Sequence, residues 1–278
     1  MKPYTKLDQP EILSSIFYPR NCAVSPLPKN AIDVAIETAP DVVIGCRFYI
    51  HDPASPNIIF FHGNGEIVPD YDDIGPLYNH AGINLLVTDY RGYSWSDGSP
   101  TVSSMIKDAD ILFTEIQNWL QFNNYSGKIF LMGRSLGSVP AIDLATTHEE
   151  DIKGLIIESG IADTIPLANA LGINTDNIDF TEDDGFRNIQ KIKTITTPTF
   201  IFHGALDEMI AADEAEKLQS FSGARTKEFV VIPGATHNTM IVTGGKLYFE
   251  TIKKFIDKVT GVTNWRRRRK TTNTYSSE

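Results

Sequence analysis

A serine between two glycines is the part of this chain that most directly suggests chemistry. Gly133, Ser135 and Gly137 follow the apolar run 128–132, which predicts a strand, and lead into the helix-prone stretch 138–145. In such a strand–turn–helix unit the serine adopts a positive φ, its hydroxyl stands clear of the sheet, and side chains two residues away would clash. The spacing therefore predicts a nucleophile elbow with Ser135 as nucleophile; the alternative is an ordinary turn.

A serine nucleophile needs a base that takes its proton. Of the six histidines, His237 is the best placed, because it lies in a loop after the last expected strand, 228–232. The carboxyl end of that strand lies at the edge of the sheet where the elbow opens. His62 and His203 each precede a glycine at a strand end, and we expect them to hydrogen-bond the backbone. His237 is therefore the predicted base.

The base needs a carboxylate that orients its ring. Asp207 follows the expected strand 199–202, one strand before His237, and is the predicted acid. Two alternatives stay open. Glu208 is its neighbour, and Glu158 ends the strand after the elbow helix.

An oxyanion hole requires two N–H donors aimed at the developing negative charge. The Leu136 N–H, directly after the nucleophile, is one expected donor. The second should come from the loop 62–66, from the Asn64 N–H in preference to that of Gly65. That loop has no P-loop lysine, and Val68 stands where a dinucleotide fingerprint needs its third glycine. No cofactor is therefore expected.

The elements that must position these residues follow an α/β pattern. The segments 32–38 and 42–50 flank Ala39-Pro40-Asp41 and predict an antiparallel hairpin. The later expected strands are 57–61, 83–88, 128–132, 155–157, 199–202 and 228–232. The expected helices are 71–81, 102–122, 135–147, 212–220 and 246–259. Nearly continuous apolar strands separated by helices predict a mostly parallel eight-stranded sheet with helices on both faces.

The segment from about 160 to 190 interrupts this alternation. It is rich in acids, with Arg187 as its single basic residue up to position 189. Those acids are Asp163, Asp176, Asp179, Glu182, Asp183 and Asp184. Ligands of open α/β sheets bind outside the carboxyl ends of the strands, so the segment is either a short lid over the site or a solvated excursion.

Composition places the chain among ordinary globular proteins. Its 278 residues are 41% hydrophobic and 22% charged, and an α/β domain of about 250 residues can fill most of that length. Residues 1–264 are therefore expected to form one domain. No signal peptide or transmembrane segment is expected, since no stretch is apolar enough, and the predicted location is cytoplasmic. Cys22 and Cys46 fit no metal or redox spacing, so no metal is expected.

Charge is distributed unevenly along the chain. The formal net charge is −10, but the run 266–270 holds five of the 25 basic residues and Glu278 is the one acid beyond it. Residues 1–264 keep 20 basic and 34 acidic residues, a net −14. A body of that charge makes nucleic acid an unexpected partner. The tail 265–278 is predicted to be disordered and is the candidate contact for anions.

Taken together, these motifs resemble the α/β-hydrolase superfamily, whose triads follow the chain order serine, acid, histidine. Within it the chain is similar to the Bem46-like branch of small-capped serine hydrolases. The resemblance is carried by Phe17-Tyr18-Pro19-Arg20, His62-Gly63-Asn64-Gly65, Asp89-Tyr90-Arg91-Gly92-Tyr93-Ser94 and Gly234-Ala235-Thr236-His237-Asn238. It implies that the segment from Asp89 buttresses the loop beside the site. Glu66 departs from the branch, because many relatives carry alanine-glycine-asparagine across Gly65-Glu66.

The resemblance implies an enzyme that cleaves a carboxylic ester or thioester through an acyl-enzyme. Its branch includes depalmitoylating acyl-protein thioesterases as well as bacterial hydrolases of unassigned substrate. The expected partner is a small-molecule ester or an acylated substrate. One alternative is a peptidase or amidase on the same triad. The other is a binding protein that has kept the fold without catalysis.

Overall fold

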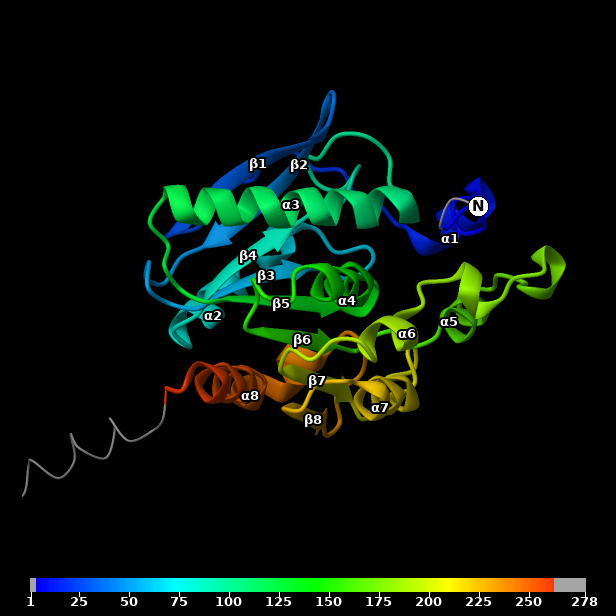
Figure 1. Cartoon of the computed structure of the whole chain (residues 1–278). Coiled ribbons are helices and arrows are strands. Elements are labelled where there is room, and N and C mark those ends of the chain that lie inside the picture. Colours follow the sequence, from blue (N-terminus) through cyan, green and yellow to red (C-terminus); the bar gives the residue numbers. More distant parts are fainter. Residues whose placement is uncertain (1–3, 263–278) are drawn as a thin grey trace, which may run out of the picture.

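A single eight-stranded sheet organises the protein (Figure 1). The computed structural model describes residues 4–262, so the tail 265–278 and the boundary at 264 lie outside the described residues. The strands are β1 (Ala31–Ala39), β2 (Val42–Tyr49), β3 (Asn57–Phe61), β4 (Asn84–Thr88), β5 (Ile129–Arg134), β6 (Gly154–Glu158), β7 (Thr199–Gly204) and β8 (Lys227–Ile232). They lie in the order β1-β2-β4-β3-β5-β6-β7-β8, with β2 antiparallel to both neighbours and the rest parallel. The mostly parallel eight-stranded sheet is confirmed.

Helices cover both faces of this sheet. They are α1 (Pro10–Ile16), α2 (Gly75–His80), α3 (Val102–Phe122), α4 (Ser138–Thr147), α5 (Thr164–Ala170), α6 (Asn188–Ile192), α7 (Ala212–Phe221) and α8 (Met240–Thr260). The 3₁₀ turns are η1 (Val68–Tyr71), η2 (Ser135–Gly137), η3 (Asp176–Ile178) and η4 (Glu182–Asp184). Buried side chains of α3, α4, α6 and α7 share one apolar cluster, whereas those of α2 and α8 share another on the opposite face.

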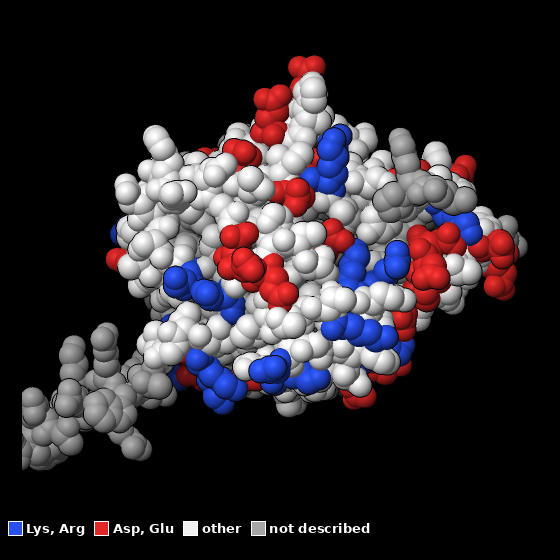
Figure 2. Space-filling view, in the orientation of Figure 1, with Lys and Arg blue, Asp and Glu red and all other residues white. Residues whose placement is uncertain are grey.

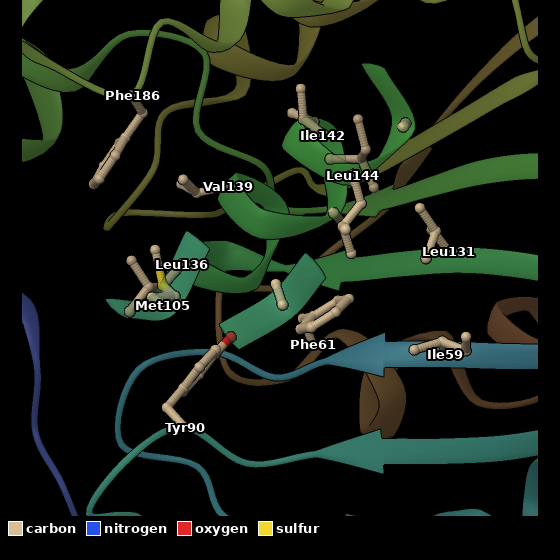
Figure 3. Packing of buried hydrophobic residues seen from close by; sticks show 14 of the residues in the cluster. Ile59, Phe61, Tyr90, Met105, Leu131, Leu136, Val139, Ile142, Leu144 and Phe186 are labelled. Atoms are coloured by element: carbon tan, nitrogen blue, oxygen red, sulfur yellow. The ribbon is translucent and has the colours of Figure 1, made fainter. Parts of the chain in front are cut away.

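The strand β5 shows how the two clusters are separated. Successive side chains of a strand point to opposite faces. Leu131 accordingly packs with Ile142 and Leu144 of α4 (Figure 3), whereas Phe130 and Met132 belong to the cluster of α8. Full burial of each such side chain contributes roughly 2 kcal/mol to folding. The central strand that leads to Ser135 is therefore clamped between both helical layers.

Three expected helices differ from the structure by more than one residue in their bounds. The stretch 71–81 is divided into η1 and α2, because Gly75-Pro76 starts a new helix. The stretch 135–147 is divided into η2 and α4. The last helix begins at Met240, six residues before its expected start, and Gly245 with φ +46° interrupts it.

The acidic segment 160–190 folds into α5, the two turns η3 and η4, and the start of α6 (Figure 1). Figure 2 shows acidic side chains gathered over this part of the surface, with basic ones beside them. Several acids are bound rather than simply solvated. Glu182 accepts the N–H groups of Thr164 and Ile165 at 2.8 and 2.7 Å, and Asp184 pairs with Lys6 at 2.9 Å. That the segment acts as a lid stays a prediction.

Candidate functional site

The nucleophile elbow has the geometry that its spacing predicts. Ser135 follows β5 with φ +51°, in the left-handed region that a serine rarely adopts. A Cβ added to Gly133 would lie 2.2 Å from the Gly137 carbonyl oxygen, and one added to Gly137 would lie 2.0 Å from that of Phe61. Both contacts are far too short for a side chain. Glycine at both positions therefore permits β3, β5 and the start of α4 to converge at Ser135.

The structure brings Ser135, His237 and Asp207 together from three separate loops. His237 Nε2 lies 3.0 Å from Ser135 Oγ, and His237 Nδ1 lies 2.8 Å from Asp207 Oδ2. The Asp207 side chain is fully buried, and the His237 side chain is 6% exposed. These contacts form one hydrogen-bonded chain from a hydroxyl through an imidazole to a carboxylate. Such a chain can pass a proton from the serine to the histidine.

Asp207 is held as a carboxylate by its surroundings. Burial by itself would raise its pKa, but hydrogen bonds from His237 and from the Ile210 N–H (2.9 Å) outweigh burial and leave the pKa below its ordinary value. The Met209 and Ile210 N–H groups both donate to Asp207 Oδ1, the former at 3.0 Å, while His237 binds Oδ2. Asp207 is therefore both ionised and fixed in orientation.

Two further histidines behave as expected from their strand-end positions. The His203 ring donates to the Ile210 carbonyl at 2.8 Å, and burial lowers its pKa. His62 faces the Gly63 carbonyl at 2.8 Å and Asp89 at 3.1 Å. Burial opposes protonation of His62, but Asp89 outweighs it and raises the pKa. Both rings bind backbone carbonyls, and neither contacts Ser135.

The alternative acids lie elsewhere. Glu158 is fully buried, accepts a hydrogen bond from Tyr248 Oη at 2.7 Å and faces Arg134 Nε at 3.3 Å. Burial outweighs Arg134 and raises the pKa of Glu158. Glu208 is exposed. The geometry therefore favours Asp207 as the partner of His237.

The loop after β3 lies beside the elbow, and its backbone N–H groups differ in whether they already have an acceptor. The Gly63 N–H donates to Glu66 Oε2 at 2.6 Å and is occupied. Within residues 4–262 the Asn64 N–H donates to no protein acceptor, while the Asn64 side-chain oxygen accepts from the Tyr18 N–H and Tyr93 Oη. That Asn64 and Leu136 supply the oxyanion donors stays a prediction.

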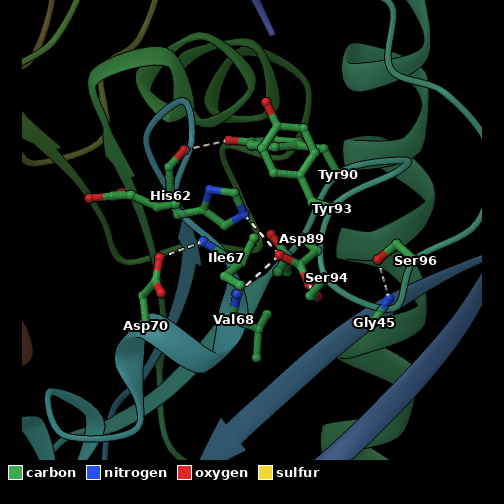
Figure 4. Close-up of polar contacts among 12 residues, drawn as sticks. Gly45, His62, Ile67, Val68, Asp70, Asp89, Tyr90, Tyr93, Ser94 and Ser96 are labelled. Carbon is green, nitrogen blue, oxygen red and sulfur yellow. Dashed lines mark hydrogen bonds and ion pairs between the residues drawn. The ribbon is translucent and has the colours of Figure 1, made fainter. Parts of the chain in front are cut away.

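Residues 89–94 buttress this loop, as the resemblance implies (Figure 4). Tyr90 Oη donates to the His62 carbonyl at 2.7 Å. Asp89 binds the His62 ring, the Val68 N–H at 3.1 Å and the Ser94 hydroxyl. Arg91 reaches away from the loop and pairs with Asp108 of α3 at 2.6 Å. Asp89 therefore supports the loop after β3, whereas Arg91 ties residues 89–94 to α3.

Sequence reasoning missed a charged cluster beneath the site. Arg134 pairs with Glu66 at 2.6 Å and faces Glu158 at 3.3 Å. Burial raises the pKa of Glu66 by itself, but Arg134 and His62 outweigh it and lower the pKa. The signals were present: Glu66 departs from the related pattern, and Arg134 directly precedes Ser135.

Residues 4–262 contain no group of three or more His, Cys, Asp or Glu side chains arranged to hold a metal ion. None of the helices formed by these residues is both long and apolar enough to cross a bilayer.

Comparisons with known proteins consistently return hydrolases. Residues 52–171 match the family described as serine aminopeptidase, S33. Alpha/beta hydrolase domain-containing protein 17B of Homo sapiens is 30% identical over 238 residues, which cover 83% of this chain and 77% of that protein.

Solved structures share the fold at low identity. The esterase Pf2001 of Pyrococcus furiosus superimposes with a TM-score of 0.70 and 18% identity, over 86% of this chain and 98% of the esterase. A monoacylglycerol lipase of Paleococcus ferrophilus gives a TM-score of 0.61 and 18% identity, over 78% and 99% of the two chains.

Proposed function

This chain belongs to the α/β-hydrolase superfamily and to its Bem46-like branch, and we propose that it is a serine hydrolase that cleaves carboxylic esters or thioesters. The observation that best supports the proposal is the hydrogen-bonded chain from Ser135 Oγ through His237 to Asp207. The positive φ of Ser135 adds support. Such a backbone conformation costs free energy of folding and is typically found at functional sites.

In the proposed reaction, Ser135 Oγ attacks the substrate carbonyl while its proton moves to His237 Nε2. The tetrahedral intermediate collapses, the bond to the alcohol or thiol breaks, and the imidazolium returns the proton to the leaving group. Water then attacks the acyl-enzyme with His237 again as base, which releases the carboxylic acid and frees Ser135. Asp207 holds the imidazole in the productive tautomer and stabilises the imidazolium.

The negative charge of each tetrahedral intermediate needs donors of its own. We assign the Leu136 and Asn64 N–H groups to this task. The Gly63 N–H is already bound to Glu66, which leaves the Asn64 N–H as the next donor along the loop. Removing one such donor typically costs about 3 kcal/mol of transition-state stabilisation.

Two substrate classes fit the same triad. The solved structures of the same fold carry the names of an esterase and a monoacylglycerol lipase, which favours an ester. The matching family is described as a serine aminopeptidase, so an amide substrate is the second candidate. A panel of p-nitrophenyl esters of increasing chain length, beside acyl-thioesters and aminoacyl amides, separates these classes.

The decisive test replaces the nucleophile. Ser135→Ala should keep the fold, since the change removes one oxygen, and should abolish both turnover and labelling by a fluorophosphonate probe. Melting temperature and circular dichroism provide the control for folding. Ordinary hydrolysis by a well-folded Ser135→Ala protein would end the serine-hydrolase proposal.

A further inference from the structure

A buried arginine next to the nucleophile takes no part in the chemistry proposed above. Arg134 is the last residue of β5, and 9% of its side chain is exposed. Its guanidinium contacts three different segments. Nη1 lies 2.6 Å from Glu66 Oε1, Nη2 lies 2.7 Å from the His237 carbonyl and 3.3 Å from Asn238 Oδ1, and Nε lies 3.3 Å from Glu158 Oε1.

The register of the sheet brings this side chain to its place. Arg134 is paired with Glu158 across the parallel strands β5 and β6. Paired residues of neighbouring strands share a face, which here is the face covered by α8. Both strands end at this pair, so the long arginine side chain extends past the strand ends and reaches the loops that follow β3 and β8.

On the side of the expected oxyanion loop, Arg134 acts through Glu66. One carboxylate oxygen of Glu66 binds Arg134, and the other accepts from the Gly63 N–H at 2.6 Å and Tyr71 Oη at 2.9 Å. A Cβ on Gly63 would lie 2.7 Å from Arg134 Nη1. The glycine at position 63 thus gives the guanidinium room against the loop backbone.

On the side of the base, Arg134 holds the backbone of His237 itself. The loop between β8 and α8 is tied internally by the Thr236 N–H, which donates to Thr239 Oγ1 at 2.8 Å. The bond from Arg134 to the His237 carbonyl joins this loop to the central strand. Because the carbonyl and the imidazole share one Cα, that bond limits where the imidazole can lie relative to Ser135.

We infer that Arg134 is a positioning residue, which sets the separation between the loop of the oxyanion donors and the loop of His237. This inference rests on the proposed function. Charge-assisted bonds made by a planar, forked guanidinium fix direction as well as distance. A misplacement of about 1 Å in a catalytic site can cost about a hundredfold in rate.

A purely structural role would be to neutralise Glu66 and Glu158 in the interior. The two roles separate in Arg134→Lys. Lysine keeps the positive charge near both carboxylates, but its single ammonium group cannot reproduce the fork that binds Glu66 and the His237 carbonyl together. Neutralisation is then retained, whereas positioning is lost.

The test compares steady-state kinetics of wild type, Arg134→Lys and Arg134→Met on one p-nitrophenyl ester. We expect kcat to fall about tenfold in the lysine variant and about a hundredfold in the methionine variant, with KM within about threefold of wild type. The rate of fluorophosphonate labelling should fall in parallel. Because unfolded enzyme also lowers the apparent kcat at unchanged KM, kcat is expressed per active site, counted by complete fluorophosphonate labelling. A fall in kcat per active site is the readout that mere loss of stability would not produce.

Arg47 offers a matched control. Its side chain is fully buried and bridges Asp33 and Asp72 at 2.7 and 2.8 Å, away from the triad. Arg47→Lys should lower the melting temperature by about as much as Arg134→Lys while kcat stays within about twofold of wild type.

Two results obtained with an active wild type would overturn the inference. One is an Arg134→Lys variant whose kcat stays as close to wild type as that of the Arg47→Lys control; the other is an Arg134→Met variant that folds and loses activity through KM alone. Either result leaves only a structural role. If wild type itself neither hydrolyses any ester nor labels, the proposed function falls and the inference with it. If wild type is active and the kcat of the Arg134 variants is unchanged, the inference about Arg134 falls while the proposed function stands.

Discussion

At the scale of single residues, the proposed mechanism depends most on the chemical identity of Asp207 after that of Ser135 and His237. Asp207→Asn keeps the size of the side chain, but an amide favours the wrong imidazole tautomer and cannot stabilise the imidazolium. We expect kcat to fall by about four orders of magnitude, with little change in KM. Steady-state kinetics on a p-nitrophenyl ester would measure this.

Glu158→Gln is the control for that prediction. Its amide oxygen can still accept from Tyr248, and the side chain makes no hydrogen bond to His237 within the described residues. The rate should therefore fall far less than in Asp207→Asn. An inactive Glu158→Gln beside a nearly normal Asp207→Asn would show that the acid is misassigned, although Ser135 and His237 would keep their proposed roles.

Glu66 predicts a pH-dependent contribution to stability. Its pKa is lowered on folding: burial opposes ionisation, but Arg134 and His62 outweigh burial. A carboxyl group with a lowered pKa stabilises the fold above its unfolded pKa of 4.5, and that contribution is lost as the pH falls through the folded value. Below that pH the Glu66 carboxyl is protonated, and it is then uncharged like the side-chain amide of glutamine.

Glu66→Gln should therefore cost about 2 kcal/mol of unfolding free energy at pH 7 and clearly less at pH 4. Urea denaturation of both proteins at the two pH values measures the difference. A cost that is equal at both pH values, or greater at pH 4, would contradict the assigned ion pair with Arg134.

The residues differ in how far the sequence could reveal them. Ser135, Asp207 and His237 each follow an apolar strand, so one rule about the carboxyl ends of parallel strands was enough to bring them together. Arg134 and Glu66 obey no such rule. They are 68 positions apart, and their contact arises only when the loop after β3 folds back over the end of β5.

At the scale of elements, the approach of β3 to the elbow depends on Gly137. Its φ of −63° suits any residue, so the backbone itself would not oppose Gly137→Ala. The added Cβ would lie 2.0 Å from the Phe61 carbonyl oxygen and 2.7 Å from that of His62. We expect a loss of about 3 kcal/mol in unfolding free energy, together with lower activity, because the loop after β3 must move.

Gly172→Ala is the matched element-scale control. Gly172 is exposed, with φ +76° and no atom within 4 Å of an added Cβ, so strain alone should cost about 1 kcal/mol. Thermal or urea unfolding of both variants tests the contrast. A smaller loss in Gly137→Ala than in Gly172→Ala would contradict the close packing of the elbow.

Element prediction succeeded where a signal is long or strongly apolar. The strands are continuous apolar runs, and α3 carries a helical pattern over 21 residues. The helices α1, α5 and α6 span five to seven residues, which is too short for periodicity to emerge. Contacts from distant residues help to hold them, as Glu182 does at the start of α5.

At the scale of the whole molecule, charge should influence which substrates arrive. The residues up to 264 carry a net −14, and acidic side chains crowd the surface over α5 and the turns after it (Figure 2). A field of this sign attracts cations and repels anions over a Debye length, which is about 30 Å at 0.01 M salt and about 3 Å at 1 M.

A cationic ester should therefore give a higher kcat/KM than an anionic ester of equal acyl length at about 0.01 M salt, by roughly fivefold. The ratio should approach one at about 1 M salt, because screening removes the long-range part of the field while contacts inside the site persist. Kinetics of the ester pair, with a neutral ester as reference, separate the two effects. A ratio that does not change with salt would assign the preference to local contacts, and faster turnover of the anionic ester at low salt would contradict the prediction.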